Sequence, residues 1–242
     1  MSAEWVLLDH QVPNRVRVDD DEGIHMSKIA IIGGHGKIAR KLAKLLTGEG
    51  HEVSALIRNP DQSDDIRATG ARPVIADIEN LTTDEIGEVI KGHDAVVFSA
   101  GAGGGSPERT YAVDRDAAIR SIDAALKVDV PRFVMVSYFG AGPDHGVPED
   151  NSFFAYAESK AQADAYLRKT TLLWTIVGPS TLTDEPGTGR IATKERGAER
   201  SDVSRDDVAA VIAAVLETPS SVGTTIEFVN GQTPIAEAVK GV

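Results

Sequence analysis

Lys28-Ile-Ala-Ile-Ile-Gly33-Gly34-His35-Gly36-Lys37-Ile38-Ala39-Arg40 is the stretch that decides the fold of this 242-residue chain. The apolar run before Gly33 lacks polar alternation, which is typical of a strand buried on both faces. After the glycines, apolar residues recur with the 3.6-residue period of a helix, at Ile38, Leu42, Leu45 and Leu46. A second apolar run follows at 53–57. This order predicts a strand–turn–helix–strand unit.

The turn in this unit has the composition of a phosphate-binding loop. Gly33 allows a tight turn, Gly36 lets the main chain approach a pyrophosphate, and small Ala39 lets the helix pack on the strand. The N–H groups of the first helical turn would face the phosphates. The pattern therefore predicts a dinucleotide site formed by Gly33, Gly34, His35, Gly36, Lys37 and Ile38. The alternative is a tight turn without a ligand.

The residue after the second strand distinguishes between the two nicotinamide cofactors. NAD-binding proteins usually have an acid there, which accepts from the ribose 2′-hydroxyl. This chain has Arg58 instead, and a guanidinium can bind a 2′-phosphate that an acid would repel. We therefore predict NADP as the cofactor, with NAD less favoured. The alternative is a solvated arginine at a strand end.

The rest of the chain continues to alternate strand and helix patterns. Further strands are predicted at 72–76, 94–99, 132–137, 172–177 and 224–229, and helices at 61–69, 83–90, 107–127, 153–167, 204–216 and 234–239. The segment 179–203 is rich in Gly, Thr and Pro and is predicted to be a loop. The pattern predicts a single α/β domain, 27–242, with a doubly wound parallel sheet.

Residues that directly follow two of these strands are further candidates for the cofactor site, because parallel strands end at one edge of the sheet. Asp77 can accept from an adenine amino group and Ile78 can lie against the ring; the alternative for Asp77 is a turn cap. Ser99, Ala100 and Gly101 are small enough to let the backbone pass close to a ligand, or they form a flexible surface loop.

Tyr156 and Lys160 lie four residues apart on a predicted helix and therefore share one face. An ammonium beside a phenol favours the phenolate, which lowers the tyrosine pKa toward neutrality. Tyr156 can then exchange a proton with a carbonyl or hydroxyl oxygen, and Lys160 can hydrogen-bond a nicotinamide ribose. The alternative is a packed tyrosine beside a solvated lysine.

Together these motifs resemble the short-chain dehydrogenase/reductase superfamily, in its atypical NAD(P)-binding branch with NmrA-like and epimerase/dehydratase-like proteins. The resemblance covers 27–239 and rests on the glycine turn, Arg58, Asp77, Ala100-Gly101, Val113-Asp114, Val136-Ser137, Tyr156 to Lys160 and Trp174 to Gly189. It implies a Rossmann fold of about seven strands with helices on both faces, and a cofactor along the carboxyl edge. It also assigns Pro179, Ser180 and Leu182 to the cofactor site and 179–203 to the substrate side.

The catalytic set implied by the resemblance is Tyr156, Lys160, Asp114 and Ser137. Asp114 stands where the family usually has Asn, and Ser137-Tyr138 replaces the usual Ser-Ser pair. Two functions stay open. One is an NADP(H)-dependent oxidoreductase or epimerase-like enzyme acting on a small carbonyl, hydroxyl or sugar-type substrate. The other is a non-catalytic NADP(H)-binding redox sensor of NmrA-like type.

Composition narrows the function classes further. A net charge of −12 argues against nucleic-acid binding. The chain has no cysteine, and its histidines show no metal-ligand spacing, so we expect no metal site. Without an apolar run of about 18 residues or a signal-peptide pattern, we expect a cytoplasmic protein that does not act on membranes. The sequence leaves the oligomeric state open.

Residues 1–26 differ from the rest of the chain. They combine an apolar patch at Trp5 with an acidic run at 19–22 and show no helix or strand period. We predict a flexible, dispensable extension, with Met26 as the functional start. The alternative is a tail that docks Trp5 on a partner subunit.

Overall fold

The computed structural model describes residues 26–104 and 106–241. Apart from the exposed Met26, the predicted N-terminal extension lies outside the described residues, and its role stays a prediction.

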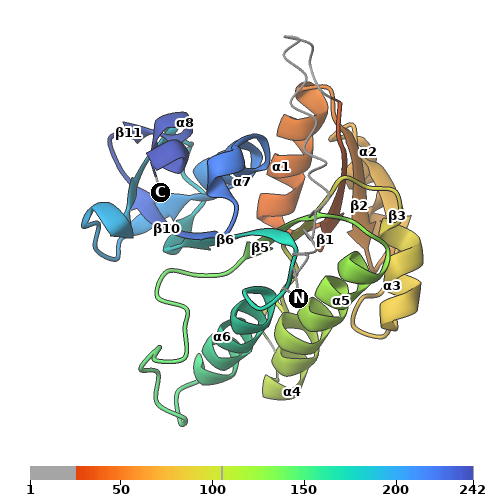
Figure 1. Cartoon of the computed structure of the whole chain (residues 1–242), viewed down its shortest axis with the longest axis horizontal. Helices are drawn as coiled ribbons and strands as arrows, with labels where there is room; N and C mark the ends of the chain where they lie inside the picture. The colour runs from red at the N-terminus through yellow and green to blue at the C-terminus, as the bar shows by residue number, and fades with distance from the viewer. Residues whose placement is uncertain (1–25, 105, 242) are drawn as a thin grey trace, which may run out of the picture.

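A nine-stranded sheet forms the centre of the described chain (Figure 1). Its strand order is β11-β8-β10-β6-β5-β4-β1-β2-β3, and all neighbours are parallel except those of β8. The strands are β1 (Lys28–Ile32), β2 (Glu52–Ile57), β3 (Arg72–Ile75), β4 (Ala95–Phe98), β5 (Arg132–Val136), β6 (Leu173–Pro179), β8 (Arg190–Thr193), β10 (Thr224–Asn230) and β11 (Thr233–Pro234). The predicted parallel sheet is confirmed, since its strands correspond to β1–β6 and β10.

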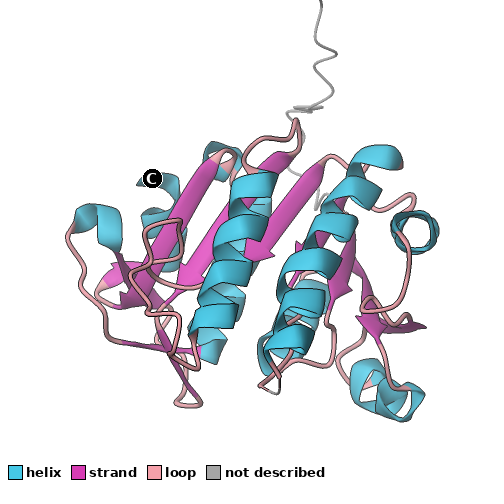
Figure 2. Ribbon diagram, turned by 90° about the horizontal axis from the view of Figure 1, so that it is seen from below, coloured by secondary structure: helices cyan, strands magenta, loops and turns pink. Residues whose placement is uncertain are grey.

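Helices cover both faces of this sheet, as predicted (Figure 1). One face carries α1 (Lys37–Gly48) and α7 (Arg205–Glu217), which pack against each other. The other face carries α3 (Thr83–Ile90), α5 (Ala118–Lys127) and α6 (Phe154–Leu167). Figure 2 views the molecule from this second face, with the sheet behind the helices. The short helices are α2 (Ser63–Arg67), α4 (Pro107–Thr110) and α8 (Ile235–Ala238).

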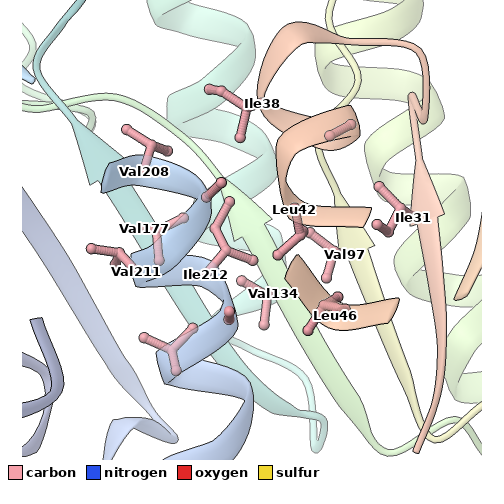
Figure 3. Packing of buried hydrophobic residues seen from close by; sticks show 14 of the residues in the cluster. Ile31, Ile38, Leu42, Leu46, Val97, Val134, Val177, Val208, Val211 and Ile212 are labelled. Carbon is pink, nitrogen blue, oxygen red and sulfur yellow. The ribbon is translucent and has the colours of Figure 1, made fainter. Parts of the chain in front are cut away.

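Two hydrophobic cores hold the helices to the sheet. Between α1, α7 and the sheet, Leu42 and Ile212 lie against strand residues such as Val134 (Figure 3). On the opposite face, Phe98 and Phe133 are fully buried against the second set of helices. Each such side chain contributes about 1.5–3 kcal/mol by leaving water. These cores fix the strand ends, and therefore the turns that follow them.

The predicted loop at 179–203 is wrong in part, because three short strands interrupt this segment. β7 (Thr181–Thr183) pairs in parallel with β9 (Asp202–Ser204), and β8 joins the main sheet beside β10. Ile191 and Val203 are fully buried and anchor the segment. The many Gly, Thr and Pro residues concealed these short strands.

The helix predicted over 107–127 is present, but its centre is a π-helical segment, Tyr111–Ala117, between α4 and α5. Such wide turns are frequent at functional sites. This one contains Asp114, whose side chain is fully buried.

Candidate functional site

A cleft of about 540 Å³ opens at the carboxyl ends of β1 to β4. It is lined by many of the residues predicted to bind a cofactor, namely Gly33, His35, Gly36, Arg58, Asp77, Ile78, Ser99, Ala100 and Gly101. They come from four separate turns, which the parallel sheet brings to one edge. This position and volume suit a dinucleotide-sized ligand.

The glycine turn at the floor of the cleft is built for close approach. Gly33 has φ +81°, and a Cβ added there would lie 2.6 Å from Ala100 Cα. The turn after β1 therefore packs directly on the turn after β4. Gly36 precedes α1 without any side-chain cap, and the first turn of α1 contains no acidic residue. The N–H groups of that turn are thus available to an anion, which fits a pyrophosphate.

Four residues predicted for this site use their side chains or backbone elsewhere. His35 Nε2 lies 2.8 Å from Asp65 Oδ2. The Gly34 N–H donates to Leu56 O at 2.8 Å. Lys37 Nζ forms an ion pair with Asp184 Oδ2 at 2.7 Å, and Ile38 packs in the core. Lys37 and Ile38 can therefore contribute through their backbone N–H groups at the start of α1, while their side chains point away.

Arg58 lines the cleft together with two charged residues that the sequence did not indicate. Arg58 Nη1 lies 3.3 Å from Glu79 Oε2, and Arg109 Nε donates to the same oxygen at 3.2 Å. Arg109 Nη1 also donates to Ala102 O at 2.7 Å. Two guanidinium groups thus share one carboxylate at this end of the cleft.

Asp77 forms the turn cap that was the alternative to adenine binding. Its Oδ1 accepts from the Glu79 N–H at 3.3 Å, and its Oδ2 accepts from Asn80 Nδ2 at 2.9 Å. Its carboxylate still lines the cleft beside Ile78.

A second cavity, of about 360 Å³, lies beyond the ends of β5 and β6. It contains the predicted residues Ser137, Tyr156, Pro179, Ser180 and Leu182. It also contains residues missed from the sequence, namely Tyr138, Phe139, Phe153, Thr181 and Arg200. Pro179, Ser180 and Leu182 therefore lie on the side of Tyr156, away from the first cleft.

A buried charge pair connects the two cavities. Asp114 Oδ2 accepts from the Ala102 N–H, in the wall of the cleft, at 2.9 Å. Asp114 Oδ1 lies 3.7 Å from Lys160 Nζ, and both side chains are almost completely buried. Lys160 Nζ in turn lies 5.8 Å from the centroid of the Tyr156 ring, in the wall of the second cavity. The structure thus brings Asp114, Lys160 and Tyr156 together.

The predicted lowering of the Tyr156 pKa is wrong for this state of the protein. Burial raises the pKa of Tyr156 well above its ordinary value, and the carboxylates of Asp114 and Asp164 raise it further. The Lys160 ammonium lies over the face of the Tyr156 ring and forms an ion pair with Asp114. Its charge is therefore balanced by a carboxylate and does not favour the phenolate. Tyr156 therefore holds its proton and is suited to donate it, as an acid.

The Ser137 hydroxyl forms a hydrogen bond with Asp164, a residue that was not predicted for the site. Ser137 Oγ donates to Asp164 Oδ2 at 2.6 Å, and both side chains are buried. Asp164 follows Lys160 by four residues in α6, so the helical period indicates a shared face. Burial raises the pKa of Asp164 to about 6, although the Ser137 hydrogen bond and the Lys160 charge oppose this shift.

The raised pKa of Asp164 predicts a pH-dependent stability. The native state binds this proton more tightly than the unfolded chain, so the free energy of unfolding falls as pH rises from about 4 through about 6. Asp164→Asn removes the buried charge. We expect it to raise the free energy of unfolding by about 2–3 kcal/mol at a pH of about 7.5, but by only about 1 kcal/mol at a pH of about 4.5.

Urea denaturation at the two pH values measures this difference. Asp64→Asn is the matched control, because the Asp64 side chain is 96% exposed. An Asp164→Asn effect that does not change with pH would show that Asp164 is not the titrating group.

Neither a metal cluster nor a membrane-spanning helix occurs among residues 26–104 and 106–241. No group of three or more His, Cys, Asp or Glu residues in this range could hold a metal ion. No helix in the same range combines the length and the hydropathy needed to cross a membrane.

Comparison with known proteins identifies the family. A family model described as NAD(P)H-binding matches residues 33–219. A Bacillus subtilis protein named an uncharacterised sugar epimerase is 35% identical, over 88% of this chain and 99% of its own length. A solved structure from Bacillus halodurans, proposed to be an NAD-dependent epimerase/dehydratase, is 34% identical, with a TM-score of 0.82 over 89% of this chain and all of that one. An oxidoreductase structure from Lactococcus lactis is 30% identical, with a TM-score of 0.79 over 89% of this chain and 96% of that one.

These matches confirm the resemblance predicted from the motifs, and they cover the cleft, the buried charge pair and Tyr156. The chain belongs to the NAD(P)H-binding family of epimerase- and oxidoreductase-like proteins.

Proposed function

We propose that the protein is an NADP(H)-dependent oxidoreductase that reduces a small carbonyl compound. The supporting observation is the contact between two cavities of different character through Asp114, Lys160 and Tyr156. One cavity has the anion-binding features of a dinucleotide site, and the other is smaller and is lined by ten residues, of which four are aromatic. The groups between them can hold and deliver a proton.

The chemistry divides between the cofactor and the chain. When bound, the nicotinamide cofactor supplies or accepts the hydride. Tyr156 donates its proton to the substrate oxygen, and its raised pKa keeps it protonated through the neutral range. Lys160, which pairs with Asp114, is the ammonium that we propose binds a ribose hydroxyl. Asp114 also holds the Ala102 N–H and so shapes the wall of the cleft.

The preference for NADP rests on the charged corner of the cleft. Arg58 and Arg109 provide two guanidinium groups against the single carboxylate of Glu79. A 2′-phosphate carries more charge than that carboxylate and can accept from both arginines. The 2′-hydroxyl of NAD offers no such charge.

Calorimetric titration with NADPH, NADP, NADH and NAD tests this proposal. We expect NADP(H) to bind about 10–100-fold more tightly than NAD(H), and Arg58→Ala to remove most of that difference. Arg67→Ala is the matched control, because Arg67 is similarly exposed and lies outside the cleft. Equal binding of all four cofactors to the wild type would contradict the NADP assignment. Absence of binding by all four would show that the glycine turn is not a cofactor site.

A second candidate function is a non-catalytic sensor of the NADP(H) redox state. It is favoured by Ser137, whose hydroxyl donates to Asp164 and is therefore not free to orient a substrate. Tight binding of NADP(H) without turnover of any compound in a broad panel of carbonyls and flavins would favour the sensor.

A further inference from the structure

We infer that the second cavity takes a small, flat carbonyl compound that carries an aromatic or conjugated group and a carboxylate. This inference deepens the proposed function and rests on it, because it names the substrate class of the same site. Three features of the cavity carry it: its aromatic walls, a guanidinium at its edge and a buried hydroxyl without a partner.

The walls of the cavity are formed largely by three rings in mutual contact. The Tyr138 ring lies 5.3 Å from Phe153 and 5.6 Å from Tyr156, measured between centroids, and Phe153 lies 5.1 Å from Tyr156. Flat apolar groups stack on such surfaces or meet their edges. At about 360 Å³, the cavity is at the small end of ligand sites. A nucleotide-sugar is too large for a cavity of this volume.

Arg200 supplies the only positive charge among the residues that line this cavity. Its Nη2 donates to Phe139 O at 2.6 Å, and its guanidinium lies 6.0 Å from the Phe139 ring centroid. Within the described ranges, no carboxylate forms an ion pair with Arg200. The remaining N–H donors form a fork that matches a carboxylate.

Tyr138 supplies the third feature. Tyr138 lines the cavity, and its hydroxyl is buried without a hydrogen-bond partner among the described residues. A buried hydroxyl is normally satisfied, so an unpartnered one in a cavity wall indicates a missing polar group. The substrate carbonyl oxygen, which Tyr156 must also reach, is such a group. Tyr138 therefore has the positioning role for which Ser137 is not free.

The reaction implied for this substrate balances. The carbonyl carbon gains a hydride from NADPH, and the carbonyl oxygen gains the proton of Tyr156. The products are the corresponding alcohol and NADP, and water returns a proton to Tyr156.

Binding of three probes to the NADP-saturated protein tests the inference. They are 4-formylbenzoate, the uncharged benzaldehyde and UDP-glucose, each titrated by calorimetry. We expect 4-formylbenzoate to bind about tenfold or more tightly than benzaldehyde, and UDP-glucose to show no binding. Arg200→Met keeps the apolar stem and is expected to remove the advantage of the carboxylate. Arg196→Met, an exposed neighbour outside the cavity, is the matched control.

Tyr138→Phe is the second variant. It keeps the ring contacts with Phe153 and Tyr156. We expect it to weaken the binding of both aldehydes by a similar factor, about threefold to tenfold, without changing NADP binding. Equal binding of the two aldehydes to the wild type, or tighter binding of UDP-glucose, would overturn the inference. If neither aldehyde binds while NADP still binds, only the inferred substrate class is rejected. If NADP itself fails to bind, the proposed function falls with it.

Discussion

Tyr156→Phe is expected to lower kcat for carbonyl reduction by about 10²–10⁴-fold and to leave the Kd for NADPH nearly unchanged. The substitution removes only the phenolic oxygen. The ring contacts with Tyr138 and Phe153 can persist, so the second cavity keeps its shape. Lys160 and Asp114 also keep their ion pair, so the wall of the cofactor cleft does not change. NADPH absorbance with 4-formylbenzoate as substrate measures turnover, and calorimetry measures cofactor binding.

Tyr166→Phe is the matched control, because Tyr166 lies on the same helix and its hydroxyl bonds to Asp123 at the surface. It should retain wild-type turnover. Full turnover by Tyr156→Phe would show that Tyr156 is not the group that donates a proton to the substrate oxygen. The pH profile adds a second check. Because burial and two carboxylates raise the pKa of Tyr156, the rate of reduction should not fall as pH rises through the neutral range on account of this group.

Most of the fold could be predicted from the sequence because its strands are buried on both faces. The apolar runs at 28–32 and 95–98 have no polar alternation, and the helix of 37–48 shows a clear apolar face. The strands between 179 and 203 could not be predicted in the same way. They are three or four residues long, and none of them buries more than one apolar residue, such as Ile191 or Val203.

The cofactor cleft was predictable because its residues directly follow predicted strands. Gly33, Arg58 and Ser99 are placed at one edge by the parallel topology alone. Glu79 and Arg109 were missed because their contact depends on where the turn after β3 meets the short helix α4, which no periodicity encodes. Asp164 is a different case, because it follows Lys160 by four residues, and this helical spacing alone predicts that the two share a face.

The protonation state of Tyr156 shows why the spacing of a pair does not fix its electrostatics. The four-residue separation of Tyr156 and Lys160 predicts proximity, and the structure has it, at 5.8 Å from ammonium to ring centroid. The direction of the pKa shift, however, is set by burial and by the carboxylates of Asp114 and Asp164. Asp114 comes from the π-helical segment before α5, and Asp164 comes from α6, the helix of Tyr156 itself. The two carboxylates around one lysine favour the protonated phenol, which is the form that can donate a proton.

Gly33→Ala is expected to have the second large effect, and it acts on both stability and cofactor binding. The added Cβ would lie 2.6 Å from Ala100 Cα and 2.7 Å from Ala100 N, which are backbone atoms that cannot rotate away. The φ of +81° adds strain for any residue with a side chain. Together we expect a loss of about 2–4 kcal/mol in the free energy of unfolding. Separation of the two turns should also weaken NADPH binding by about tenfold or more.

Gly48→Ala is the matched control, since it adds the same methyl group to the end of α1 where no atom lies within 4 Å. Alanine is the better helix former, so this variant should be more stable by about 0.5–1 kcal/mol and should bind NADPH as the wild type does. Urea denaturation and calorimetry on the two variants separate the causes. If Gly33→Ala lost cofactor binding but kept its stability, the methyl group would act on the ligand directly, and the contact between the turns after β1 and β4 would not be what shapes the cleft.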